Sequence, residues 1–136
     1  MPNMIIPFDT ARHHIYIKFF VTHPLSGSRH SFNGILDTGA PRTEFADVVL
    51  SQIGFIANAD HEVGIGPGLQ TQKYGKTVLP SIEICGHIIQ NFEVLVSRFE
   101  KSWGIAALIG LDFFRRFRVA IDYEAGLITT EPFSQK

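Results

Sequence analysis

The stretch Gly34-Ile35-Leu36-Asp37-Thr38-Gly39-Ala40 decides how the rest of the chain is interpreted. Its first apolar residues predict the end of a strand, and Asp37-Thr38-Gly39 predicts a sharp turn directly after it. Gly39 lets the backbone pass close to the carboxylate of Asp37, where a Cβ would intrude. An acid on a tight loop at the end of an apolar strand is a candidate chemical centre, because apolar surroundings disfavour its charged form.

The same tripeptide is also ordinary turn chemistry. Asp and Thr side chains cap turns, and Gly readily adopts positive φ. Taken alone, Asp37-Thr38-Gly39 is explained equally well as a turn and as a site. The remainder of the chain therefore has to decide between them.

Composition restricts the class of protein. The chain has 136 residues, which predicts one domain over residues 1–136. An apolar content of 45% excludes a disordered chain, and a formal charge of −1 argues against nucleic acid as the main partner. The single Cys85 excludes an internal disulfide and fits a reducing compartment. Without a recognisable signal peptide or an apolar run long enough to span a bilayer, we expect a cytoplasmic protein with no membrane partner.

Alternating apolar residues predict many short strands. The expected strands cover residues 15–21, 29–36, 78–84, 88–96, 107–110, 118–123 and 127–130, with a break or sheet edge near Pro80. Two short helices are expected at residues 46–53 and 112–117, the second capped by Asp112. The pattern predicts an all-β barrel or folded sheet with one or two short helices.

Residues 62–74 predict a further hairpin with a mobile tip. Gly64, Gly66 and Gly68 gather there around Ile65 and Pro67. This is not a nucleotide-binding loop, since no βαβ unit follows it. A plain surface hairpin explains the same pattern when it is considered alone.

With these elements in order, the chain resembles the retropepsin-like aspartic proteases, which are single-lobe relatives of pepsin. Residues 36–40 resemble their active-site loop, and residues 63–74 resemble their flap. Residues 107–110, followed by Asp112-Phe113-Phe114, resemble their late apolar-Gly motif and the short helix after it. The resemblance runs from about residue 15 to residue 130 and implies an acid-protease barrel with one lobe per chain.

The resemblance implies catalysis by Asp37, Thr38 and Gly39, with substrate contacts from Ala40, Gly64, Ile65, Gly66, Gly68 and Ile109. Hydrolysis of a peptide by water needs one carboxylate as base and one carboxylic acid. Two unit charges about 4 Å apart repel by roughly 4 kcal/mol at an effective dielectric near 20, so such a pair shares one proton. Because the chain has one Asp-Thr-Gly, the second carboxyl has to come from a second copy in a two-fold homodimer.

Some residues depart from the family's pattern. Ala40 matches the retroviral type, where no hydroxyl follows the Gly, so activity is not expected to be confined to strong acid. In retroviral members an acid after the loop pairs with an Arg after the late Gly. Pro41, Arg42 and Leu111 cannot form that bridge, which leaves open how the dimer is braced.

Other candidate sites are weaker. His13 and His14 with Asp9 fit no common zinc spacing, so we expect no metal and no cofactor. Cys85 lies between apolar strands and is expected to be buried and unreactive, and Trp103 is expected to pack in the core or an interface. The basic run Arg115, Arg116 and Arg118 is more typical of a solvated face than of a binding site.

Two functions follow. The first is a homodimeric aspartic endopeptidase that acts on a peptide or protein substrate. The second is an inactive member of the fold that serves as a dimerisation or peptide-binding module. The intact Asp37-Thr38-Gly39 and the glycine-rich hairpin favour the first, because an enzyme that has lost its function is free to lose both.

Overall fold

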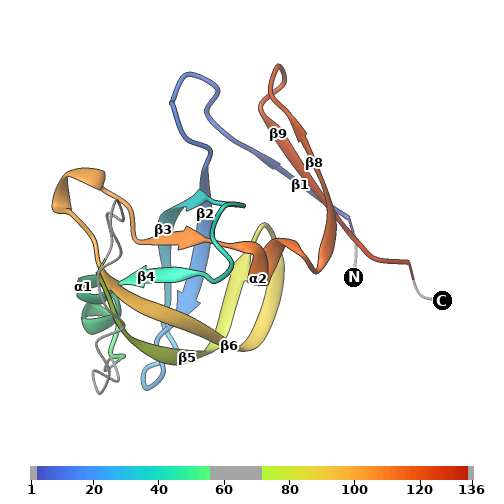
Figure 1. Ribbon diagram of the computed structural model, residues 1–136. Helices are drawn as coiled ribbons and strands as arrows, with labels where there is room; N and C mark the ends of the chain where they lie inside the picture. Colours follow the sequence, from blue (N-terminus) through green and yellow to red (C-terminus); the bar gives the residue numbers. More distant parts are fainter. Residues whose placement is uncertain (1–2, 56–71, 135–136) are drawn as a thin grey trace.

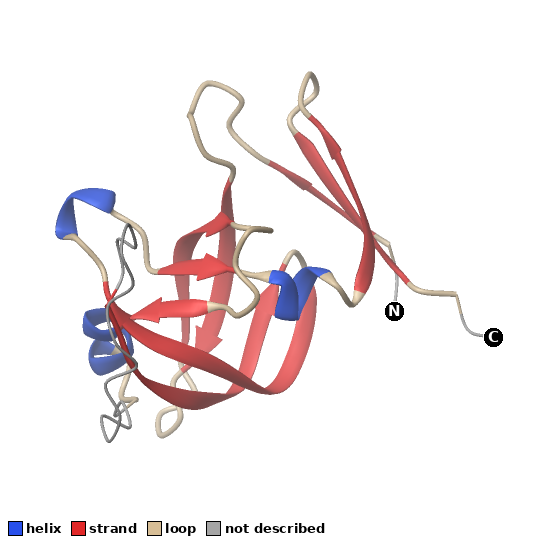
Figure 2. Ribbon diagram, viewed as in Figure 1, coloured by secondary structure: helices blue, strands red, loops and turns tan. Residues whose placement is uncertain are grey.

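A computed structural model describes residues 3–55 and 72–134 of the chain. Within these ranges the strands form a closed barrel, in the order β2-β3-β7-β4-β6-β5, and a separate sheet, in the order β1-β9-β8 (Figure 1). The elements are β1 (Met4–Pro7), β2 (Tyr16–Thr22), β3 (Arg29–Leu36), β4 (Glu44–Ala46), α1 (Asp47–Gln52), β5 (Gln72–Ile84), β6 (His87–Arg98), η1 (Lys101–Trp103), β7 (Ala107–Ile109), α2 (Leu111–Phe114), β8 (Phe117–Asp122) and β9 (Leu127–Pro132). Figure 2 shows how small the helical share is, so the expected all-β class with short helices is confirmed.

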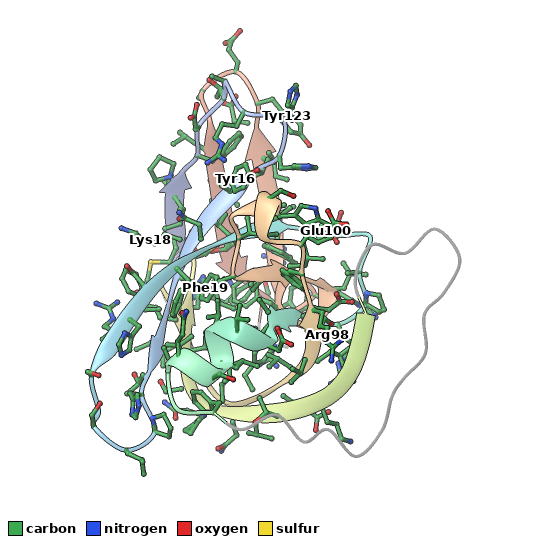
Figure 3. All side chains as sticks on the ribbon, turned by 90° about the vertical axis from the view of Figure 1, so that its left-hand side faces the viewer. Tyr16, Lys18, Phe19, Arg98, Glu100 and Tyr123 are labelled. Atoms are coloured by element: carbon green, nitrogen blue, oxygen red, sulfur yellow. The ribbon has the colours of Figure 1, made fainter. Side chains whose placement is uncertain are left out.

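The hairpin of β2 and β3 leads into the Asp37 loop. The two strands pair antiparallel from Tyr16 opposite Ile35 to Thr22 opposite Arg29. Along β2 every second side chain is buried, which is the alternation expected of a strand with one face on a core. Figure 3 shows Phe19 pointing into the barrel, where it meets Phe45 with ring centroids 5.3 Å apart. The predicted strands at residues 15–21 and 29–36 are therefore confirmed.

The long hairpin of β5 and β6 closes the other side of the barrel. Its tip is formed by Cys85 and Gly86, both with positive φ, as a two-residue turn of the type I′ class requires. Of the break or sheet edge expected near Pro80, the break does not occur, because β5 continues through it between the register pairs Leu79–Phe92 and Ser81–Gln90. The pairs of β5 with β2 run from Ile82 to Ile84, so Pro80 lies beyond that pairing, as a sheet edge requires. Cys85 is buried, as expected, and burial raises the pKa of its thiol to about 12.

The two ends of the chain meet in the β1-β9-β8 sheet, which stands beside the barrel in Figure 1. The hairpin of β8 and β9 was predicted, but β1 was not. His87, at the start of β6, ties this sheet to the barrel. Its Nε2 lies 2.7 Å from the hydroxyl of Thr130 in β9, and its ring stacks on Phe117 of β8 at 4.2 Å.

One further strand was missed, and one further expectation needs correction. Strand β4 was not predicted, and the short strand runs antiparallel to β7 and parallel to β6. The helix that contains Asp112 begins after Gly110, which is its N-cap, and no side chain caps it. Asp112 is the second residue of the helix and therefore not its cap, and its carboxylate oxygens accept hydrogen bonds from Thr43.

Candidate active site

Asp37 lies on a tight loop that is fixed through its backbone. The N–H of Asp37 donates to the carbonyl of Ile109 at 2.8 Å, and the N–H of Ala40 donates back to the carbonyl of Asp37 at 3.2 Å. The N–H of Gly39 donates to the carboxylate of Asp37 at 3.1 Å. Asp37 is half-buried, whereas Thr38 and Gly39 are exposed at the rim. The loop therefore presents one oriented carboxylate at an open surface.

Two parallel strands carry this loop. Leu36 at the end of β3 lies opposite Ile109 at the end of β7, so the chain segments after both strands emerge side by side. Gly34 allows this close packing. A Cβ at this position would lie 3.0 Å from the carbonyl oxygen of Ala107 and 3.1 Å from the ring of Phe19. A residue with a side chain at position 34 would therefore push β3 away from β7 and from the ring of Phe19.

Gly110 provides a second close approach. A Cβ on Gly110 would lie 2.7 Å from the carbonyl oxygen of Ala40 and 2.9 Å from the carbonyl of Arg42. The N–H of Leu111 also donates to the carbonyl of Ala40 at 2.8 Å. The late Gly that the sequence singled out therefore packs directly under the Asp37 loop, and any side chain would displace that loop.

A polar network that the sequence did not reveal supports the same region. Thr43 is fully buried. Its hydroxyl accepts from the N–H of Gly110 at 3.1 Å and donates to the carboxylate of Asp112 at 2.7 Å. The N–H of Thr43 donates to the second oxygen of Asp112 at 2.9 Å. This network joins the segment after the loop to α2.

An ion pair also braces the segment after the loop. Arg42 donates to Glu93 of β6 at 2.7 Å, and its Nε lies 3.8 Å from the carboxylate of Asp112. The hydrogen bond from Arg42 and the charge of Lys76 together lower the pKa of Glu93. In the retroviral pattern an acid follows the loop and an Arg follows the late Gly. In this chain the order is reversed: Arg42 follows the loop, and Asp112 follows Gly110.

The structure brings part of the predicted site together. Asp37, Thr38, Gly39 and Ala40 lie on one loop, and the carbonyl of Ile109 holds that loop. The side chain of Ile109 is fully buried in the core, while Leu108, its neighbour in β7, is half-buried. Gly64, Ile65, Gly66 and Gly68 lie outside the described residues, as do residues 63–71 of the predicted flap, whereas its residues 72–74 form the start of β5.

The other candidates can be placed briefly. No group of three or more His, Cys, Asp or Glu side chains in the described ranges is arranged to hold a metal ion. Trp103 is half-buried and packs against Phe99, with ring centroids 5.6 Å apart. Among the described residues, no helix has the length and apolar character that a membrane span requires.

Comparison with known proteins identifies the fold. No protein-family model matches the chain, and no curated protein matches it. Among solved structures it is similar to a retropepsin-like aspartic protease from Rickettsia conorii, with a TM-score of 0.67 and 20% identity over 95% of this chain and 89% of that one. It is also similar to the retroviral protease-like domain of Ddi1 from Leishmania major, with a TM-score of 0.61 and 13% identity over 89% of this chain and 94% of that one. The chain therefore has the retropepsin-like aspartic protease fold.

Proposed function

We propose that the protein is a homodimeric aspartic endopeptidase in which each chain supplies one Asp37. The observation that carries this proposal is the Asp37 loop, whose carboxylate is oriented by the N–H of Gly39 at an exposed rim. Asp112 follows the late Gly nearby, but its oxygens already accept from Thr43. It is therefore a poor second member of a catalytic pair, and a two-fold axis between two Asp37 loops supplies one instead.

In this mechanism the two Asp37 carboxyls share one proton. The ionised carboxylate takes a proton from a water held between the pair, and that water attacks the peptide carbonyl. The protonated partner donates to the carbonyl oxygen as that oxygen gains negative charge. The carboxyl that took the proton from the water then gives it to the amide nitrogen as the C–N bond breaks, and the partner recovers its proton as the carbonyl re-forms. Exposed Thr38 would meet its counterpart near the axis, and Gly39 would keep each carboxylate aimed at the water.

The proposal also covers the domain and its substrate contacts. We treat residues 1–136 as a single domain, with substrate contacts from Ala40, Gly64, Ile65, Gly66 and Gly68. Ile109 was also predicted to contact substrate, but it is fully buried, and its part is to hold the Asp37 loop through its carbonyl. The contacts assigned to residues 64–68 depend on the resemblance in sequence alone. A cytoplasmic location, favoured by the single Cys85, stays a prediction.

The test is cleavage of a peptide library by the parent and by Asp37→Asn. This change keeps the size of the side chain but removes the ionisable group from both halves of the dimer at once. Cleavage should disappear while fold and dimer remain. Asp9→Asn is the matched control, because the carboxylate of Asp9 accepts the N–H of Ala11 in an exposed turn, and its replacement should leave cleavage unchanged.

Two outcomes would count against the proposal. Equal cleavage by the parent and by Asp37→Asn would remove Asp37 from catalysis. A folded, dimeric parent that cleaves nothing between about pH 3 and pH 8 would favour the peptide-binding module.

A further inference from the structure

An open hollow of about 390 Å³ lies beside the Asp37 loop, and the proposed function does not use it. Its lining comes from the end of the loop and from α2: Pro41, Leu111, Asp112, Arg115 and Arg116. Pro41 directly follows Ala40, whose carbonyl accepts the N–H of Leu111 at 2.8 Å. In Figure 1, α2 lies at the end of β7, between the barrel and the β1-β9-β8 sheet. One wall of the hollow is therefore continuous with the candidate active site.

Two arginines in this hollow have donors to spare. The side chain of Arg115 is exposed and makes no hydrogen bond or ion pair within the part of the chain that the structure describes. Arg116 uses its Nε to donate to the carbonyl of Asp112 at 2.9 Å, and its guanidinium lies 5.5 Å from the ring of Phe92. This bond fixes the direction of the Arg116 side chain, and its terminal N–H groups remain available.

The acidic residue in the lining does not cancel these charges. Both oxygens of Asp112 accept hydrogen bonds from Thr43, and Arg42 lies 3.8 Å away. Arg42 itself is engaged by Glu93 as well as by Asp112. The nearby acids are therefore already matched, and Arg115 and Arg116 leave the hollow with an excess of positive charge.

We propose that this hollow is a subsite for a carboxylate side chain of the peptide substrate, Glu or Asp. The inference rests on the proposed protease function and goes beyond it to sequence preference. Guanidinium groups suit a carboxylate because their parallel N–H donors match its two oxygens. The apolar surfaces of Pro41 and Leu111 would accommodate the methylenes of the same side chain.

The distance from Asp37 to the hollow determines which residues of the substrate, counted from the cleaved bond, can contact it. Four peptide units separate Asp37 from Pro41, so their Cα atoms lie at most about 15 Å apart. An extended peptide covers about 3.3 Å per residue, so the hollow is within roughly four residues of the cleaved bond. Because a two-fold dimer carries two hollows, the preference for acids should occur on both sides of that bond.

The experiment uses peptide pairs that differ only by Glu or Gln at one position, scanned over four positions on each side of the bond. The parent should cleave Glu peptides roughly two- to fivefold better in kcat/KM, mainly through KM, as expected of an exposed ion pair. The preference should shrink as salt is raised, because exposed charges are screened. Arg115→Gln and the double variant with Arg116→Gln should lose this preference, so that each variant cleaves the Glu and Gln peptides of a pair equally.

Two variants control for other effects. Arg29→Gln removes the same charge at the far end of β3, where Arg29 pairs with Glu83, and should keep the preference. Arg115→Lys keeps the positive charge but loses the parallel N–H donors of the guanidinium, and it should retain part of the preference for Glu peptides. Equal cleavage of Glu and Gln peptides at every position by an active parent would overturn the subsite. A preference that survives in the double variant would do the same.

A separate binding measurement distinguishes the subsite from the protease function. If the folded parent cleaves no peptide, the proposed function fails, and fluorescence anisotropy with the same labelled pairs then tests the hollow alone. Tighter binding of Glu peptides that the double variant loses would support the hollow as a carboxylate site. Equal binding of Glu and Gln peptides would refute it.

Discussion

The hydroxyl of Thr43 donates a 2.7 Å hydrogen bond to the carboxylate of Asp112, which lies 69 residues away in sequence. The same hydroxyl accepts the N–H of Gly110, so one buried side chain connects the segment after the Asp37 loop to α2. Because the hydroxyl is both donor and acceptor, its loss would leave two partners unmet at once. The network therefore holds in place the backbone that packs under the Asp37 loop.

Replacing this hydroxyl should destabilise the protein. Thr43→Val keeps the shape of the side chain but leaves a part-buried carboxylate oxygen and a buried N–H unsatisfied, at a cost of about 2 kcal/mol. Thr43→Ser is the control, since it keeps the hydroxyl and loses one methyl group, worth about 1 kcal/mol. Urea unfolding of both variants measures the difference. An equal loss in the two would mean that the hydroxyl is not the stabilising group.

The space under the loop gives a second prediction. In Gly110→Ala the new Cβ would meet the carbonyls of Ala40 and Arg42 at 2.7 and 2.9 Å, and these are backbone atoms that cannot rotate away. The Asp37 loop has to shift, so peptide cleavage should fall by at least about tenfold, because misplaced catalytic groups are costly.

Gly27→Ala provides the comparison for that variant. Gly27 lies in the turn between β2 and β3, far from Asp37, with φ at +73° and no neighbouring atom within 4 Å of where a Cβ would stand. It should lose about 1 kcal/mol of stability from backbone strain and keep its cleavage rate. Comparable cleavage by Gly110→Ala and the parent would show that the loop tolerates the added carbon.

The sequence predicted the elements whose signal is local. Burial alternates along all seven residues of β2 and along the first six of β3, and the Asp37 loop is marked by its tripeptide. Strand β4 was missed because it has only three residues, all of them buried, so no alternation exists to detect. Strand β1 was missed because it is short, ends at Pro7 and pairs with β9 at the opposite end of the chain.

The supporting contacts of the site had no such local signal. Thr43 and Asp112 are joined only by the fold, and so are Arg42 and Glu93, which lie 51 residues apart. Asp112 was predicted as a helix cap because acids are common there, but the helix begins at Leu111, and the carboxylate of Asp112 accepts hydrogen bonds from Thr43. Long-range polar pairs of this kind depend on which strands become neighbours, and a single sequence does not reveal that.

His87 makes stability depend on pH. It is buried, and loss of water around its ring lowers its pKa below the usual value of 6.5. The unfolded chain therefore binds a proton at a higher pH than the folded chain does. Its contribution to stability is complete above about pH 6.5 and falls as the pH drops from there to the lower folded-state value. Protonation would also place a charge between Thr130 and the ring of Phe117.

Urea unfolding between about pH 7.5 and pH 5 measures this dependence. In His87→Gln the free energy of unfolding should change less with pH than in the parent, even if the variant is less stable overall. His13→Gln removes an exposed histidine and should keep the dependence of the parent. If His87→Gln and the parent show the same slope against pH, protonation of His87 is not the cause.

The shared active site gives the last prediction, which concerns mixtures of two proteins. If every active dimer needs two Asp37 carboxyls, a dimer of one parent chain and one Asp37→Asn chain should be inactive. After exchange of subunits, adding an equal amount of the variant should reduce the activity of a fixed amount of parent to about half, and a ninefold excess to about one tenth. A chain that cleaves peptides as a monomer would lose no activity.

Asp9→Asn, added in the same amounts, should not reduce activity, because its heterodimers keep both Asp37 carboxyls. Unchanged activity in the presence of excess Asp37→Asn, with subunit exchange demonstrated by a labelled chain, would exclude a catalytic pair assembled across two chains.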